Sequence, residues 1–90
     1  MTRRFLQDRQ RLRDALATID PGGTDMPAER LEDVRVLIDA GELEVGLEIL
    51  SDNIYEFMVP VPEGTRSVLI EIGRSIGLGK HYLDLLSNPN

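Results

Sequence analysis

The stretch GELEVGLEILSDNIYEF, residues 41–57, decides the fold, because it carries the clearest helical pattern in the chain. Its apolar residues recur every three or four positions, so they share one side of a helix. These residues are Leu43, Leu47, Leu50, Ile54 and Phe57. Gly41 can adopt the left-handed conformation that ends a preceding helix. Gly46, at the edge of the stripe, costs up to about 1 kcal/mol relative to Ala but lets a neighbouring helix approach closely. We therefore expect a helix over residues 42–57 that packs against another helix.

Two segments upstream of this stretch show the same periodicity. Residues 1–20 contain an amphipathic helical pattern of about 17 residues, flanked by Arg9 and Arg13, with Phe5, Leu12, Leu16 and Ile19 on its apolar side. After the turn residues at 20–23, Asp25 is the expected N-cap of a second helix, with Pro27 in its first turn. The apolar side of that helix consists of Leu31, Val34, Leu37 and Ile38.

Downstream, residues 62–76 follow two prolines and present Val68, Leu69, Ile72 and Ile76. Their β-branched run is also compatible with a strand. The prolines oppose a hairpin partner, because proline lacks a ladder donor, so we favour a helix. Residues 82–86 then add a short closing turn or helix. The sequence predicts an all-α fold: a compact bundle of three to four helices plus a short C-terminal helix.

Length and composition place this bundle in one domain. Ninety residues bury a single core, so we expect one helical domain over 1–90, with an amphipathic Arg-rich helix at 1–20 and an acidic helical core at 26–86. Hydrophobic residues make up 41% and aromatic ones only 4%, so the core must be aliphatic. There is no cysteine, no signal-peptide pattern and no long apolar run, which together predict a cytoplasmic protein without disulfides or a membrane span. Whether residues 1–20 pack on the bundle or project as a basic arm stays open.

The net charge of −6 is distributed unevenly. Residues 1–20 carry five arginines against three aspartates, whereas residues 27–64 carry two arginines against ten acidic residues. The acidic block opposes nucleic-acid binding, where phosphate contacts need Lys and Arg. It favours a basic protein partner, because complementary fields accelerate association, although ordinary solubility explains the same charge.

Motifs for catalysis or cofactors are lacking in the sequence. His81 is the only histidine, and its neighbour Asp84 has no nucleophile with which to form a triad. The chain offers no two-histidine zinc spacing, no calcium loop and no Gly-rich phosphate loop. No serine lies in the Asp-Ser-Leu motif of acyl carrier proteins. We expect no enzymatic activity, no metal and no cofactor.

The outward side of the helix over 42–57 is the candidate partner-binding site. Its acidic residues follow one another at intervals of four and form a slowly curving stripe: Glu44, Glu48, Asp52 and Glu56. Such like-charged pairs destabilise a helix by about 0.2–0.5 kcal/mol each, and no Lys or Arg interrupts them. Val45, Ile49 and Tyr55 accompany the acids, and this mixture of groups is typical of an interface. Two alternatives stay open: a purely solvated face, or a face covered by the first helix, with its arginines on the acids and Val45 and Ile49 packed beneath it.

From about Leu37 to Leu86, just over half of the chain, the sequence resembles the MafI family of immunity proteins. The resemblance centres on residues 41–50, GELEVGLEIL, and continues through DNIYE at 52–56. That family typically shows a Gly-Glu opening, a later Leu-Glu pair and an acid near the helix end, then a proline-containing linker and a short final helix. The chain departs from the family at Leu43, often aromatic there, and at Gly46, usually alanine.

The resemblance implies an immunity protein that neutralises a cognate bacterial toxin of a polymorphic or contact-dependent inhibition system by protein–protein interaction. The cognate toxin domain would carry a basic surface for the acidic residues named above. An acidic adaptor or regulatory domain that docks to another cytoplasmic protein is the alternative. A helix-turn-helix DNA binder formed by residues 65–86 has less support, since it offers phosphates only Arg66, Arg74 and Lys80.

Overall fold

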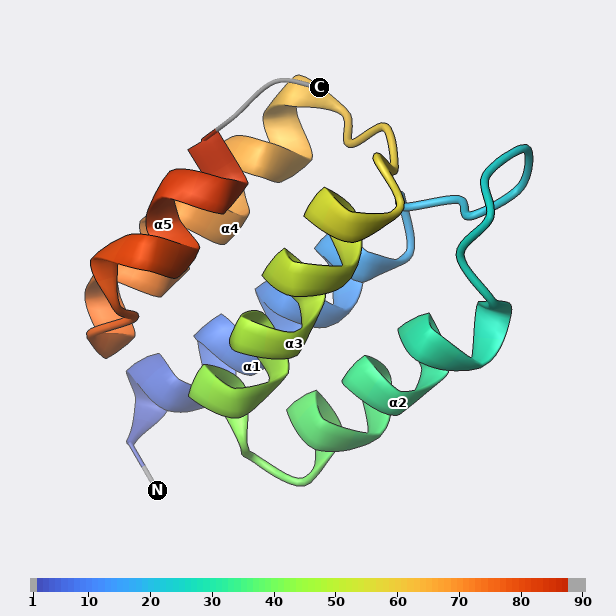
Figure 1. Cartoon of the computed structure of the whole chain (residues 1–90). Helices are drawn as coiled ribbons and strands as arrows, with labels where there is room; N and C mark the ends of the chain where they lie inside the picture. Colours follow the sequence, from blue (N-terminus) through green and yellow to red (C-terminus); the bar gives the residue numbers. More distant parts are fainter. Residues whose placement is uncertain (1, 88–90) are drawn as a thin grey trace.

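The computed structural model describes residues 2–87, which contain five helices and no strand (Figure 1). The helices are α1 (Arg3–Leu16), α2 (Ala28–Asp39), α3 (Leu43–Glu56), α4 (Glu63–Ile76) and α5 (Lys80–Ser87). The prediction of an all-helical fold is confirmed, and the strand alternative for the β-branched run before residue 76 is wrong. None of the helices in the described range is long and apolar enough to cross a lipid bilayer.

The helices lie in two layers (Figure 1). In the view of the figure, α2, α3 and α5 lie in front, and α1 and α4 lie behind them. Helix α3 is central, in contact with α2, α4 and α5, while α1 packs against α2 and α4. The N-terminal helix is therefore part of the bundle and does not project as a basic arm. The radius of gyration, 11.9 Å, agrees with the value of about 12 Å expected for a single compact domain of this length.

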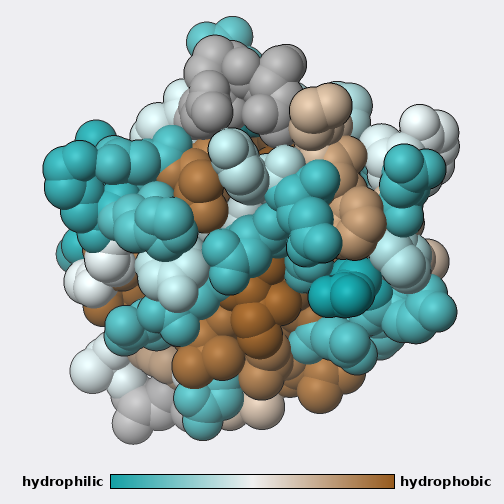
Figure 2. All heavy atoms as spheres, in the orientation of Figure 1, coloured by the Kyte–Doolittle hydropathy of each residue, from teal (hydrophilic) through white to brown (hydrophobic). Residues whose placement is uncertain are grey.

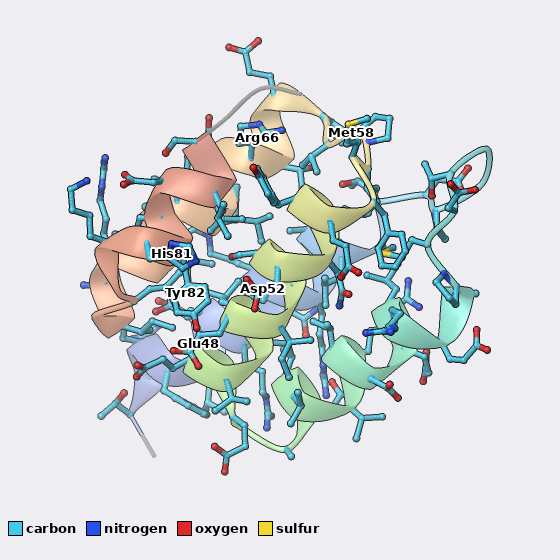
Figure 3. The ribbon with its side chains drawn as sticks, viewed as in Figure 1. Glu48, Asp52, Met58, Arg66, His81 and Tyr82 are labelled. Carbon is cyan, nitrogen blue, oxygen red and sulfur yellow. The ribbon has the colours of Figure 1, made fainter. Side chains whose placement is uncertain are left out.

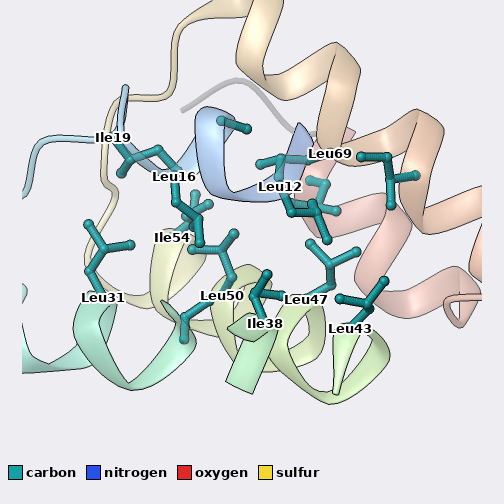
Figure 4. Close-up of a cluster of buried hydrophobic side chains, with 14 of the residues drawn as sticks. Leu12, Leu16, Ile19, Leu31, Ile38, Leu43, Leu47, Leu50, Ile54 and Leu69 are labelled. Carbon is teal, nitrogen blue, oxygen red and sulfur yellow. The ribbon is translucent and has the colours of Figure 1, made fainter. Parts of the chain in front are cut away.

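The core between the layers is aliphatic, as the composition predicts. Figure 4 shows Leu12 and Leu16 of α1 facing Leu47 and Leu50 of α3, and all four are at most 1% exposed. The predicted stripes of the other helices also point inward, with Leu31, Val34, Ile38, Leu69 and Ile72 buried. Phe5, Phe57, Val68 and Ile76 are partly buried and pack against the edges of the core. Leu37, which the pattern places on the apolar side of the second helix, is partly buried but does not belong to this set.

The connection between α2 and α3 is a tight reversal at Gly41. Its φ of +85° is left-handed, as predicted, and it lets the Glu42 amide donate to the Leu37 carbonyl across 2.9 Å. This pattern satisfies carbonyl groups that a helix end leaves free. It makes α2 and α3 adjacent antiparallel helices, and one edge of the exposed side of α3 borders α2.

The predicted starts and ends of two helices are wrong by a few residues. Asp25 is not the cap of α2, because the helix begins at Ala28 and Pro27 occupies the N-cap position. Helical geometry is disfavoured at the residue before a proline, so Met26 lies outside the helix, where it is buried in the core at 4% exposure. Helix α1 ends at Leu16, and Ile19 reaches the core from the turn that follows it.

Candidate partner-binding face

The outward side of α3 carries all seven residues predicted for partner binding. Glu44, Asp52 and Glu56 are exposed, and Glu48 is half-buried. Three apolar or aromatic side chains accompany them: Val45 is 42% exposed, Ile49 37% and Tyr55 53%. We call these seven residues the α3 face. The opposite side of the helix is buried, so amphipathic periodicity alone places the α3 face correctly.

The acidic residues of the α3 face have no cationic partner in the part of the chain that the structure describes. Within residues 2–87, none of its four carboxylates forms a salt bridge. The arginines of α1 pair elsewhere: Arg11 with Glu71 at 2.8 Å, and Arg13 with Asp39. The alternative in which α1 covers the acids, with Val45 and Ile49 beneath it, is therefore wrong. The physical reason is that α1 contributes its apolar side to the far side of the core, so its arginines cannot reach α3's outward side.

The two charged helices consequently lie on opposite sides of the core. Helix α1 carries five arginines and two aspartates, whereas α3 carries four acidic residues and no basic one. The positive helix is partly neutralised by its neighbours. The hydrogen bond from Arg11 lowers the pKa of the Glu71 carboxyl, and the same bond raises the pKa of the guanidinium. The acids of α3 form no salt bridge within the described residues, so acidic side chains without a basic neighbour give this side of the molecule a negative potential.

Acidic and apolar side chains are mixed across the α3 face. At 100° per residue, Val45 and Ile49 lie toward α2 with Glu56 between them. Glu44 and Glu48 lie toward the opposite side with Tyr55 between them, and Asp52 lies in the middle. Figure 2 shows hydrophobic surface in the lower middle of this view, with hydrophilic side chains on both sides of it. Apolar surface bordered by charge is the arrangement found in many protein interfaces.

Helix α5 places two residues at the border of the α3 face. The sequence does not predict that these two residues lie there. Helices α3 and α5 are packed together, and in Figure 3 Tyr82 and His81 lie on the side of α5 that borders Glu48 and Asp52. The two rings meet edge to face, with centroids 5.1 Å apart. The sequence holds the residue types but not their position, because the turn at Gly77 sets the direction of α5.

The described residues show neither a hydrogen bond between His81 and Asp84 nor a group of metal-binding side chains. Asp84 does not orient His81, because its carboxylate accepts a hydrogen bond from Lys80 at 2.7 Å. Within residues 2–87, no three His, Cys, Asp or Glu side chains are grouped so that they could hold a metal ion. Two shallow grooves lie along α4, away from the α3 face. One of 510 Å³ is lined by Ala15, Thr65 and Val68 among others, and one of 590 Å³ by Arg4, Ser67 and Arg74 among others.

Comparisons with protein families, with curated proteins and with solved structures find no match for this chain. The resemblance to immunity proteins therefore stays a prediction from the residues quoted above. The α3 face is the feature of the described chain from which function can be argued.

Proposed function

We propose that this chain is an immunity protein that binds a cognate bacterial toxin domain and neutralises it through the α3 face. The observation that carries the proposal is that this face presents four acidic side chains, three of them exposed and Glu48 half-buried, that form no salt bridge within residues 2–87. Val45, Ile49 and Tyr55 are exposed beside them. Placing like charges along one helix is unfavourable, and exposed aliphatic groups gain nothing from folding. Both features become favourable when a basic, partly apolar protein surface covers them.

The chemistry of the face indicates what the partner must offer. Four carboxylates call for a surface rich in Lys and Arg, and they would raise the association rate through long-range attraction. Val45, Ile49 and Tyr55 would supply the dehydrated centre from which most binding energy comes. Binding of this kind neutralises a toxin either by filling its active site or by covering the path of its substrate. The proposed site of action is the cytoplasm.

A co-expression experiment tests the proposal. The C-terminal domain of the protein encoded directly upstream is expressed in a sensitive bacterial host, with and without this chain, and surviving colonies are counted. We expect the domain alone to kill and the chain to restore growth. A variant with Asp52→Lys and Ile49→Asp should fold but fail to rescue. A harmless neighbour, or a toxic one that the chain leaves active, would contradict the proposal and favour the acidic adaptor.

The DNA-binding alternative receives less support from the side chains of α4 and α5. Arg66 donates to the Leu86 carbonyl, and Lys80 pairs with Asp84 at 2.7 Å. Two of the three cations that this alternative needs therefore already have partners within the chain. A salt-sensitive shift of duplex DNA by the purified chain would restore it.

A further inference from the structure

The turn after α3 contains an unusual backbone conformation at Met58. Its φ of +49° makes it the one non-glycine residue among residues 2–87 in the left-handed region. The equivalent turns after α2 and α4 use Gly41 and Gly77, with φ of +85° and +81°. A side chain in this conformation crowds the backbone, and glycine avoids that cost.

The fold explains the backbone at Met58 but not its side chain. The left-handed residue lets the Val59 amide donate to the Ile54 carbonyl across 3.1 Å, and Val59 is then completely buried. The Met58 side chain points the other way and is 67% exposed, the largest fraction among the large hydrophobic residues of the described chain. A glycine would make the same turn without strain and without an exposed apolar group. The turn and the burial of Val59 therefore do not require a methionine side chain at position 58.

Met58 lies where it can extend the α3 face. Figure 3 shows it beyond the C-terminal end of α3, in the same view that displays Glu48 and Asp52. Its amide donates to the carbonyl of Tyr55, 3.3 Å away, so the two exposed side chains belong to one turn. Met and Tyr are enriched in interfaces, and methionine adapts its shape to irregular pockets. Strained residues occur preferentially where a protein binds.

We infer that Met58, with Tyr55, is the apolar anchor of the α3 face and enters a hydrophobic depression on the toxin domain beside its basic surface. The inference rests on the proposed function. It adds a second requirement to the basic surface, namely that the partner has an apolar pocket. The carboxylates select a basic surface, and the anchor selects an apolar pocket at the end of that surface that meets the C-terminal end of α3. A uniformly cationic partner, such as a nucleic-acid-binding tail, lacks that pocket.

The first test needs no partner. Met58→Gly and Met58→Asn both accept the left-handed conformation, and thermal unfolding is followed by circular dichroism. We expect Met58→Gly to raise the Tm by about 3–6 °C, because strain is relieved in a domain of this size. A fall in Tm for both variants would overturn the inference, because it would show that the side chain stabilises the fold.

The second test measures affinity for an inactivated form of the upstream-encoded toxin domain by calorimetry. We expect Met58→Gly and Met58→Asn to weaken binding at least about tenfold, as loss of an interface anchor does. Met58→Leu keeps an apolar side chain and should stay within about threefold of the parent chain. Leu6→Asn removes an exposed apolar group from α1, on the other side of the core, and should not change the affinity.

The outcomes separate the inference from the proposed function. A domain that binds the parent chain and responds to Asp52→Lys, but binds the Met58 variants unchanged, overturns the anchor and leaves the proposed function standing. A domain that does not bind the parent chain overturns the proposed function. It also overturns the inference that Met58 anchors the chain to this partner. Weakening by Met58→Gly and Met58→Asn, with Met58→Leu and Leu6→Asn near the parent, supports the anchor.

Discussion

Gly46 of α3 lies so close to Ile38 of α2 that a Cβ on the glycine would stand 2.7 Å from the Cδ1 atom of Ile38. Such a distance is below any normal carbon contact, so a side chain at this position forces the isoleucine to move. Ile38 is 1% exposed, so its side chain would have to move within the buried core. The glycine therefore sets the spacing of the hairpin that supports the α3 face.

This contact predicts a coupled pair of substitutions. Gly46→Ala gains up to about 1 kcal/mol of helix propensity but loses about 1–3 kcal/mol to crowding, so we expect a net destabilisation. Ile38→Val alone should cost about 0.5–1.5 kcal/mol, because it removes a buried methyl group. In the Ile38→Val background the obstructing atom is gone, and Gly46→Ala should become neutral or stabilising. Urea unfolding of the four chains gives the coupling energy, and additive effects would contradict the contact.

The helices and their buried sides could be predicted from the sequence because both depend on local periodicity. Leu12, Leu47 and Leu69 each belong to a different segment in which apolar residues recur at helical spacing between glycine or proline breaks. The same periodicity places the α3 face toward solvent. The role of Gly46 in helix contact was also predicted correctly. These features need no knowledge of how the helices are arranged in space.

Tertiary relations could not be predicted in the same way. The pairing of Arg11 with Glu71 joins residues that are 60 positions apart, and nothing in the sequence distinguishes Glu71 from the acids of α3. The position of Tyr82 at the border of the α3 face depends on the direction that α5 takes after the turn at Gly77. The left-handed backbone at Met58 depends on burying Val59, and methionine is not a residue that signals such a turn.

The Arg11–Glu71 pair predicts a pH-dependent contribution to stability. The pair lowers the pKa of Glu71 below its ordinary value of 4.5, so its contribution is fully present at higher pH and is lost as the pH falls through the lowered pKa. Glu71→Gln should therefore lower the Tm slightly at about pH 6, and the difference from the parent chain should be smaller at about pH 3. The effect should be small and sensitive to salt, because both side chains are exposed. An equal difference at both pH values would contradict this explanation.

Two exposed glycines with open space around them should respond in opposite ways to alanine. Gly77 has a φ of +81°, so Gly77→Ala should destabilise the protein by about 1–2 kcal/mol through backbone strain alone. Gly64 lies in the first turn of α4 without a positive φ, so Gly64→Ala should stabilise by up to about 1 kcal/mol. Thermal or urea unfolding measures both. Effects of the same sign would show that the turn after α4 does not require its left-handed residue.

Charge reversal on the α3 face tests the proposed mode of binding, and Asp52 is the better position. Asp52 is exposed, whereas Glu48 is half-buried beside α5, so Glu48→Lys risks disturbing helix packing. We expect Asp52→Lys to leave the Tm within about 2 °C of the parent and to slow association with the toxin domain about tenfold at low salt. The difference should shrink as ionic strength rises, because salt screens exposed charges.

Asp33→Lys is the matched control for this experiment, because it makes the same change in net charge at an exposed position on α2. If general attraction to an acidic protein determines the rate, both reversals should slow association equally. If the α3 face meets the partner, Asp52→Lys should also accelerate dissociation, because a lysine would then face the basic surface at short range. Stopped-flow association and dissociation rates for the two variants distinguish these cases. Equal effects would place the interface outside α3, even if the chain protects against the toxin.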